Sequence, residues 1–473
     1  MFRRNEASST LPTTSAGSFF AANVDADGLP PEVEEGNVEY KLKLIDPPPE
    51  RFDHLVTQMK WRLAEGYGEA MYEIGVSDRG DLVGLLPADL EASIATLRRM
   101  GEVLSADVCI VREKEVGTDP VRKVAEVLVR KCLDDQHFLE VRVAIVGSAD
   151  AGKSTLLGVL THSETDNGRG KSRLNLLRHR HEIVSGRTSS ISHQIIGFTP
   201  TGTIINFSTT SIQTPEQICE TAAKVITFLD MCGHPKYQKT TISGLTGHAP
   251  DYVGLVLGAN VGGLSEISKE HFGTAVVLKV PVFVVLTKID VASGEELTGT
   301  VESLLGLLKT PGIRRVPMVI QNEDDLVVAV SSFVSSRVVP IFLTSAVTGD
   351  NLNLLTSFLN LLPKSTRNYD QLLEQEPEFQ IKETYSVPDV GCVVGGVLLS
   401  GRINVSLTSH QTQSYHLGPD RGTFIPVRVT SIHRQRCPVN YIKAGQAASC
   451  ALTFLDPSNP LAPPSLTPPP GFK

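Results

Sequence analysis

The spacing of apolar residues divides the 473-residue chain into parts with different patterns. Residues 1–36 are polar, contain Gly and Pro, and are expected to be a disordered tail. Apolar residues at helical spacing run from Phe52 to Leu63, and a second amphipathic helix carries Leu90 and Met100 on one face. Strand-like runs lie between and after these helices. The pattern predicts a small α/β domain over residues 37–138.

Short β-branched runs alternate with helical patterns over residues 139–365. Parallel strands that are separated by helices need right-handed crossovers, which produce a doubly wound, mostly parallel sheet with an α/β fold. The predicted strands are Val141–Val146, Lys224–Leu229, Tyr252–Leu257, Val282–Leu286 and Pro340–Leu343.

The pattern changes again over residues 366–455, where short strands are separated by Gly, Pro and Asp. This arrangement predicts a small C-terminal β-barrel. The segment Asn404–Leu417 lacks the alternation of a barrel strand, and residues 456–473 hold seven prolines and are expected to be an extended or disordered tail. The predicted strands are Phe379–Val387, Gly391–Leu399 and Phe424–Ile432.

Composition and charge restrict the possible partners. The chain is 41% hydrophobic and 20% charged, with a net charge of -8 and a pI near 5.9, so we expect no binding to DNA through bulk positive charge. No apolar run reaches the roughly 18 residues that a membrane span needs, and no membrane partner is expected. The seven cysteines are scattered without a CxxC pair, which favours reduced thiols and a cytoplasmic location.

The first chemical motif follows the strand Val141–Val146 and fits G-x-x-x-x-G-K-[ST]. Its glycines allow backbone N–H groups to turn toward phosphate oxygens at a helix N-terminus. Lys153 is expected to reach the β- and γ-phosphates, and the Ser154 hydroxyl is expected to bind Mg²⁺. The predicted phosphate-binding residues are Gly147, Ser148, Ala149, Asp150, Ala151, Gly152, Lys153, Ser154 and Thr155.

The second motif ends the strand Lys224–Leu229. Asp230 can hold Mg²⁺ through water, and the N–H of Gly233 can contact a γ-phosphate. An aspartate in a turn after a strand is common by itself, so this motif gains its meaning from the others. The predicted binding residues are Asp230, Met231, Cys232, Gly233 and His234.

The third and fourth motifs select the base. Asp290 is expected to accept two hydrogen bonds from guanine N1 and N2, which adenine cannot donate, and an ATP-dependent enzyme is thereby excluded. Four motifs in order at the carboxyl ends of parallel strands predict GTP as the ligand. The predicted base-binding residues are Thr287, Lys288, Ile289, Asp290, Ser345 and Ala346.

Together with several longer runs, these motifs resemble the translational GTPases, in particular the GTP-binding protein 1 and GTP-binding protein 2 family. The resemblance covers residues 37 to about 452. It implies hydrolysis of GTP to GDP, elongation-factor-like barrels, and action on or near ribosomes in translation or in ribosome and mRNA quality control. The runs that carry it are Leu139–Leu160, Asp166–Arg173, His181–Ile191, Val225–Tyr237 and Ser386–Gly401.

The resemblance also implies roles for individual residues. His234 matches the histidine that orients the attacking water in elongation factors, and it is the predicted catalytic residue. Switch I is expected over Asp166–Phe198, where Ser190 is the first candidate and Thr188 the second for the hydroxyl that closes on Mg²⁺. The predicted metal ligands are therefore Ser154, Ser190 and Asp230.

Residues 164–187 hold six basic side chains against three acids. This window is interpreted either as a solvated loop or as an RNA-facing patch. The basic residues are Arg169, Lys171, Arg173, Arg178, Arg180 and Arg187, and the acids are Glu164, Asp166 and Glu182.

The sequence departs from the family in two respects. The positions that shield the attacking water look like Ala149 and Ser189, which are small or polar. The pattern also lacks a second β-barrel, so we expect weak binding of aminoacyl-tRNA at best. The alternative function is a GTP-dependent signalling or scaffold switch that binds proteins through residues 37–138 and the proline-rich tail.

Overall fold

The structure is a computed structural model that describes residues 29, 31–32, 36–116, 121–131, 138–177, 179–186, 188–208, 212, 214–310, 312–333, 337–364, 369–405, 414–420 and 422–455. Most of the predicted N-terminal tail, residues 456–473, most of Asn404–Leu417, Arg178 and Arg187 lie outside the described residues. Among the described helices, none is both long enough and apolar enough to cross a membrane.

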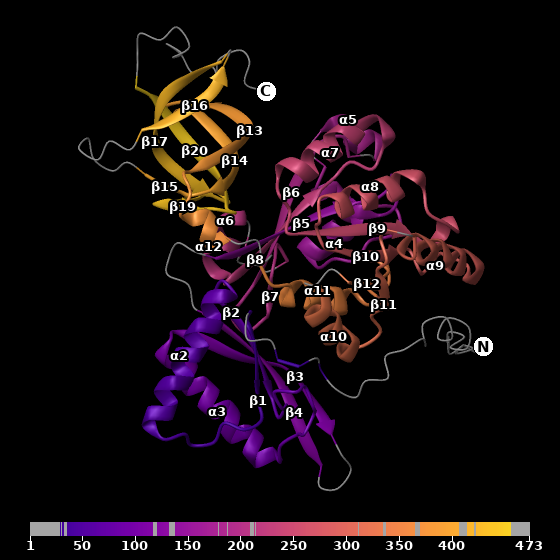
Figure 1. Cartoon of the computed structure of the whole chain (residues 1–473). Helices are drawn as coiled ribbons and strands as arrows, with labels where there is room; N and C mark the ends of the chain where they lie inside the picture. The colour runs from indigo at the N-terminus through magenta and orange to yellow at the C-terminus, as the bar shows by residue number, and fades with distance from the viewer. Residues whose placement is uncertain are drawn as a thin grey trace, which may run out of the picture.

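The N-terminal part is a four-stranded sheet in the order β1-β2-β4-β3, with two helices against one face (Figure 1). Both helices have a proline in the first turn, where the missing N–H group has no helical partner to lose. Met59 and Leu97 from the helices pack with Tyr72 and Val127 from the sheet. The elements are β1 (Val38–Lys41), α2 (Pro49–Glu65), β2 (Glu69–Ile74), α3 (Pro87–Val103), β3 (Ala106–Val116) and β4 (Arg122–Lys131).

The central part is an eight-stranded sheet in the order β11-β12-β10-β9-β5-β8-β6-β7. Neighbouring strands from β11 to β8 are parallel, which confirms the doubly wound, mostly parallel sheet. The last two strands, β6 and the edge strand β7, pair antiparallel with their neighbours, and β6 occupies the end of the predicted switch I. The strands are β5 (Leu139–Val146), β6 (Ser192–Phe198), β7 (Ile204–Ile205), β8 (Lys224–Asp230), β9 (Tyr252–Gly258), β10 (Val282–Thr287), β11 (Val316–Val319) and β12 (Val338–Leu343).

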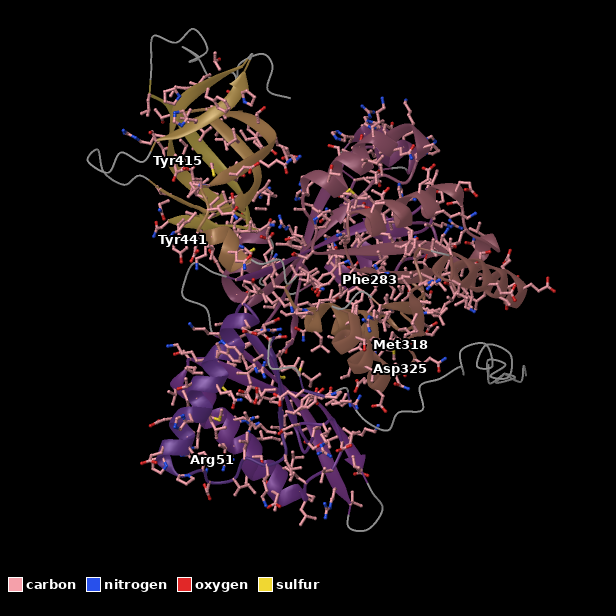
Figure 2. The ribbon with its side chains drawn as sticks, viewed as in Figure 1. Arg51, Phe283, Met318, Asp325, Tyr415 and Tyr441 are labelled. Atoms are coloured by element: carbon pink, nitrogen blue, oxygen red, sulfur yellow. The ribbon has the colours of Figure 1, made fainter. Side chains whose placement is uncertain are left out.

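Helices cover both faces of this sheet. One core contains residues of α4, α10 and α11 together with Phe283, which Figure 2 labels in the central part; the other contains residues of α7, α8 and α9. The helices of the central part are α4 (Lys153–His162), α5 (Arg180–Ser185), α6 (Pro215–Thr221), α7 (Gln238–Gly247), α8 (Glu266–Val277), α9 (Gly294–Leu308), α10 (Glu323–Phe333) and α11 (Leu352–Leu361), and α12 (Tyr369–Leu373) lies beside the C-terminal part. Three 3₁₀ turns are η1 (Ser172–Asn175), η2 (Pro235–Tyr237) and η3 (Ala259–Val261).

The C-terminal part is a curved antiparallel half-barrel, drawn in orange and yellow in Figure 1. Ile425, Val427 and Val429 alternate along one strand and are buried in its core, as expected for a strand with one solvated face. The strands are β13 (Glu378–Val387), β14 (Gly391–Ser400), β15 (Arg402–Asn404), β16 (Tyr415–Asp420), β17 (Thr423–Arg434), β18 (Cys437–Val439), β19 (Tyr441–Lys443) and β20 (Ala447–Phe454).

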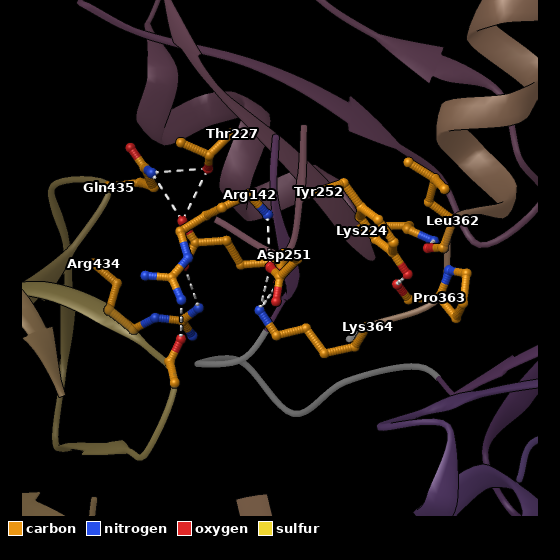
Figure 3. A network of polar contacts seen from close by, with 12 residues as sticks. Arg142, Lys224, Thr227, Asp251, Tyr252, Leu362, Pro363, Lys364, Arg434 and Gln435 are labelled. Atoms are coloured by element: carbon orange, nitrogen blue, oxygen red, sulfur yellow. Dashed lines mark hydrogen bonds and ion pairs between the residues drawn. The ribbon is translucent and has the colours of Figure 1, made fainter. Parts of the chain in front are cut away.

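A buried ionic network joins this half-barrel to the start of β5 (Figure 3). Arg434 pairs with Glu140 at 3.3 Å, and Arg142 Nη2 donates to the carbonyl oxygen of Gly445 at 2.7 Å. Burial alone would raise the pKa of Glu140, but the charges of Arg434, Arg142 and Lys364 lower that pKa to about 2. The half-barrel is therefore held by charges at the amino-terminal end of the strand that leads to Gly147.

A second ionic contact joins the N-terminal part to the start of β8. Lys224, the first residue of β8, is fully buried and pairs with Glu69 of β2 at 2.9 Å. Arg130 of β4 pairs with the same carboxylate at 2.7 Å. Lys224 Nζ also donates to the carbonyl oxygen of Leu362 at 2.6 Å. Both flanking parts are thus attached at the amino-terminal ends of central strands.

Candidate active site

The turn between β5 and α4 has the backbone shape that cradles a phosphate. Gly147 and Gly152 have φ angles of +141° and +88°, which L-residues with a side chain rarely adopt. A Cβ on Gly147 would lie 2.1 Å from the carbonyl oxygen of Val256, so only glycine fits there. Because α4 begins at Lys153, the free N–H groups of its first turn face this loop.

The Lys153 ammonium group lies over the loop and makes no ion pair within the described part of the chain. It is buried, and its Nζ donates to the carbonyl oxygens of Gly147 at 3.2 Å and Ser148 at 2.8 Å. Burial lowers its pKa below the ordinary lysine value, although the nearby Asp230 charge opposes this effect. Among the residues that the structure describes, the hydrogen-bond partners of Lys153 Nζ are neutral carbonyl groups, which phosphate oxygens can replace.

Three oxygen-bearing side chains meet beside Lys153. Ser154 Oγ donates to Asp230 Oδ2 at 2.6 Å and lies 3.0 Å from Thr188 Oγ1. Asp230 Oδ1 is buried and has no hydrogen-bond partner in the described part of the chain. Burial raises the pKa of Asp230 to about 6, against the opposing charge of Lys153. Hydroxyl and carboxylate oxygens are the ligands that Mg²⁺ prefers, so this group fits that ion.

The structure does not bring Ser190, the first candidate for the switch I hydroxyl, to this group. Its Oγ and its N–H donate to Glu182 Oε1 at 3.3 and 3.2 Å, and the same oxygen accepts the N–H and Oγ of Ser189 at 2.7 Å each. Although burial would raise the pKa of Glu182, these hydrogen bonds lower it to about 2. Thr188, the second candidate, takes the place beside Ser154.

Gly233 allows the turn after β8 to pack against the phosphate loop. A Cβ there would lie 2.4 Å from Lys153 Nζ and 2.6 Å from the carbonyl oxygen of Gly147. The carbonyl oxygen of Gly233 accepts the N–H of Ala149 at 2.9 Å. The side chains of Met231 and Cys232 are buried, so only the backbone of these two residues can serve a ligand.

His234 lines one small pocket together with Lys153, Ser154 and Thr155. Its Nδ1 accepts the N–H of Lys236 at 3.2 Å. In a neutral imidazole whose Nδ1 is an acceptor, the hydrogen is on Nε2. The ring is thus fixed with one N–H group available, in the pocket that the phosphate loop forms.

The guanine motifs line a cavity of about 420 Å³ that contains Lys288, Asp290 and Ala346. Ser345 Oγ donates to Asp290 Oδ1 at 2.6 Å, which fixes the carboxylate. Thr287 Oγ1 donates to the carbonyl oxygen of Ala151 at 2.6 Å and so ties this motif to the phosphate loop. The partly buried Ile289 follows Lys288 in the turn.

Two further residues belong to the site and were not assigned to it from the sequence. Arg173, predicted only as part of the basic window, lines both pockets. His271 of α8 is buried, and its Nδ1 accepts the N–H of Gly147 at 3.2 Å. Burial lowers the pKa of His271 to about 4, which favours the neutral ring that this acceptor role requires. No sequence pattern relates His271 to a loop 124 positions earlier.

Comparison with known families shows the class of protein to which the chain belongs. Residues 140–364 match the family described as Elongation factor Tu GTP binding domain. The chain is thus a GTPase of the translation-factor class, as predicted.

Comparison with individual proteins then defines the family. The chain is 51% identical over 434 residues to GTP-binding protein 2 of Homo sapiens, covering 90% of this chain and 71% of that protein. It is 47% identical over 464 residues to GTP-binding protein 1 of Xenopus laevis, covering 94% of this chain and 68% of that protein. The chain belongs to the GTP-binding protein 1 and GTP-binding protein 2 family.

Among solved structures, a bacterial selenocysteine-specific elongation factor aligns with a TM-score of 0.46 and 20% identity, over 67% of this chain and 43% of that one. The elongation factor SelB of Methanococcus maripaludis, in complex with a GTP analogue, aligns with a TM-score of 0.45 and 20% identity, over 67% of this chain and 52% of that one.

Proposed function

We propose that this GTPase acts on or near ribosomes, in translation or in ribosome and mRNA quality control, as a cytoplasmic protein. The observation that carries the proposal is the meeting of the phosphate loop, the Asp230 turn and the guanine motifs around two adjoining pockets. Such a site at the carboxyl ends of parallel strands suits a nucleotide. Membership in a family of translation-factor-class GTPases supports the role in translation.

Binding and base selection are assigned to different residues. Lys153 and the N–H groups of the first turn of α4 bind the β- and γ-phosphates. Asp290, held by Ser345, accepts the N1 and N2 hydrogens of guanine. Thr287 keeps these two regions at a fixed separation, because its hydroxyl joins the guanine motif to Ala151.

Ser154, Thr188 and Asp230 are the residues that would hold Mg²⁺. When bound, this ion neutralises charge on the β- and γ-phosphates. The buried Asp230 Oδ1, which lacks a partner within the described residues, supports this assignment. Thr188 replaces Ser190 in it because its hydroxyl already lies 3.0 Å from Ser154 Oγ.

His234 is assigned to orient the attacking water through Nε2. His234→Ala should reduce ribosome-stimulated turnover by about two to four orders of magnitude, the usual range for a positioned catalytic group. Nucleotide affinity should stay within a few-fold of wild type, since the proposed role is in hydrolysis and not in ground-state phosphate binding. Lys153→Ala is the control that should weaken binding itself. Equal stimulated turnover in wild type and His234→Ala would assign the water to another residue.

The ribosome and tRNA are the partners that suit this class, with weak binding of tRNA expected. The deciding measurement is GTP turnover with and without purified ribosomes. A rise in turnover on adding ribosomes supports the proposal. No response, with intact GTP binding, would favour a GTP-dependent switch that binds proteins through residues 37–138.

A further inference from the structure

The run Asp166–Arg173 is a specific sequence feature that the proposed roles leave unused. It forms the loop that leads from α4 to η1 together with the first two residues of η1, and it begins at the guanine pocket. The N–H of Asp166 donates to the carbonyl oxygen of Ala346 at 2.8 Å. The start of the loop is therefore fixed to the motif that is assigned to the base.

The Asp166 carboxylate also folds the loop. Its two oxygens accept the N–H groups of Gly170 and Ser172, each at 2.9 Å. Gly168 and Gly170 have φ angles of +76° and +81°, which favour glycine. Burial would raise the pKa of Asp166, but backbone hydrogen bonds hold it below the ordinary value. The aspartate and the glycines of the run thus specify one tight turn.

The end of the loop is docked on α4, the helix that begins at Lys153. A Cβ on Gly158 of α4 would lie 2.3 Å from the carbonyl oxygen of Ser172, so the close approach requires glycine. Leu176, just after η1, is buried in the central core. The loop is consequently held at the guanine motif and at the helix that carries the phosphate loop.

This arrangement delivers one side chain to the site. Arg173 lines the phosphate pocket with Lys153 and His234, and it also lines the base pocket with Asp290. Its Nη1 donates to the carbonyl oxygen of Gly186 at 3.3 Å. No carboxylate pairs with Arg173 among the described residues. A guanidinium with five N–H groups and one neutral partner has donors left for a ligand.

We propose that Arg173 is a second phosphate-binding residue, whose guanidinium binds phosphate oxygens of GTP and GDP where the two pockets meet. The proposal rests on the proposed GTP site. Arginine matches phosphate geometry with two parallel hydrogen bonds, which lysine cannot reproduce. Arg173 therefore neutralises phosphate charge together with Lys153, which belongs to a different element of the site.

The test measures binding of fluorescent GDP and of a non-hydrolysable GTP analogue. Arg173→Gln should weaken both by about tenfold or more, in line with the loss of charge-assisted hydrogen bonds. Arg173→Lys should recover part of the affinity. Lys171→Gln is the matched control, because Lys171 belongs to the same loop and its contact with Glu164 leaves both side chains 66% and 68% exposed. That variant should bind both nucleotides as wild type does.

Two further readouts separate phosphate binding from a structural effect. Guanosine, which has no phosphate, should compete equally well in wild type and Arg173→Gln. Free guanidinium, well below denaturing concentrations, should restore nucleotide affinity to Arg173→Ala. Equal weakening of guanosine and GDP, or an absence of rescue, would overturn the proposal. Normal affinity in Arg173→Gln would also overturn it. If Lys153→Ala weakened nucleotide binding in that case, the proposed GTP site would still be supported and only the role of Arg173 would be wrong.

Discussion

Polar groups lie at both ends of strands β5 and β8, but the two ends differ in how these groups are paired. At the carboxyl ends, Lys153 donates to neutral carbonyl groups and Asp230 Oδ1 has no partner within the described residues. At the amino ends, Glu140 and Lys224 are paired with charged side chains from the flanking parts. The proposed nucleotide would complete the carboxyl ends, whereas the protein itself completes the amino ends.

The pKa values of two buried carboxylates, one at each end, reflect this difference in pairing. The pKa of Asp230 on β8 is raised to about 6, because burial outweighs one lysine and one hydroxyl group. The pKa of Glu140 on β5 is lowered to about 2, because three cations outweigh the same burial. Substitutions at the carboxyl ends should therefore change nucleotide chemistry, and substitutions at the amino ends should change stability.

The largest effect is expected for base selection. Asp290→Asn should exchange the preference for GTP for a preference for xanthosine triphosphate, because the NH2 group that replaces one carboxylate oxygen can donate to the O2 of xanthine but cannot accept from guanine N2. Loss of a paired hydrogen-bond site changes discrimination by about four orders of magnitude or more. Competition binding measures the ratio. An unchanged preference for GTP would remove Asp290 from the base pocket.

The next effect concerns the amino end. Glu140→Gln should lower the free energy of unfolding by about 3 kcal/mol, since it leaves the buried Arg434 without its paired carboxylate and removes a negative charge near Arg142. Denaturant unfolding with GDP present measures the change, and Glu302→Gln on the exposed side of α9 is the control. GDP affinity should stay within a few-fold. A large loss of GDP affinity with normal stability would contradict the division between the two ends.

A smaller effect separates the two candidate hydroxyl groups. Thr188→Val should weaken GTP binding at limiting Mg²⁺ by about tenfold, as expected for loss of one ligand of a bound ion. Ser190→Ala should stay within about twofold, because its hydroxyl serves Glu182 as one of several donors. GTP titrations at high and low Mg²⁺ provide the comparison. The reverse order of effects would restore Ser190 as the ligand in the GTP-bound state.

The smallest effect lies in the N-terminal sheet and depends on pH. Glu126 and its cross-strand neighbour Glu73 are both buried, and burial raises the pKa of Glu126 from 4.5 to about 7. Because the folded-state pKa is raised, its contribution to stability is present below pH 4.5 and is lost as the pH rises through 7. Glu126→Gln should thus stabilise the protein by about 1 kcal/mol at pH 8 relative to pH 6. Thermal unfolding at both values measures it; a difference independent of pH would exclude this titration.

The local sequence was sufficient to predict the sheet and the backbone conformation of the proposed nucleotide-binding loops. Apolar runs such as Val282–Leu286 are buried on both faces and predict parallel strands, so the order of motifs at the strand ends followed directly. Gly147 and Gly152 need positive φ angles, a requirement set by the backbone of the loop itself. The antiparallel strand β6 was missed because Ser192, His193 and Gln194 interrupt its apolar pattern.

The sequence by itself determined the class of fold, the family and the motifs that we expect to contact a nucleotide, because these depend on residues that are close along the chain. Only the tertiary structure decided which side chains meet across long separations. Glu140 pairs with Arg434, 294 positions away, and Gly147 contacts His271, 124 positions away. The choice between Thr188 and Ser190 also depended on where Glu182 lies, since hydrogen bonds act over about 3 Å and no local pattern fixes such a distance.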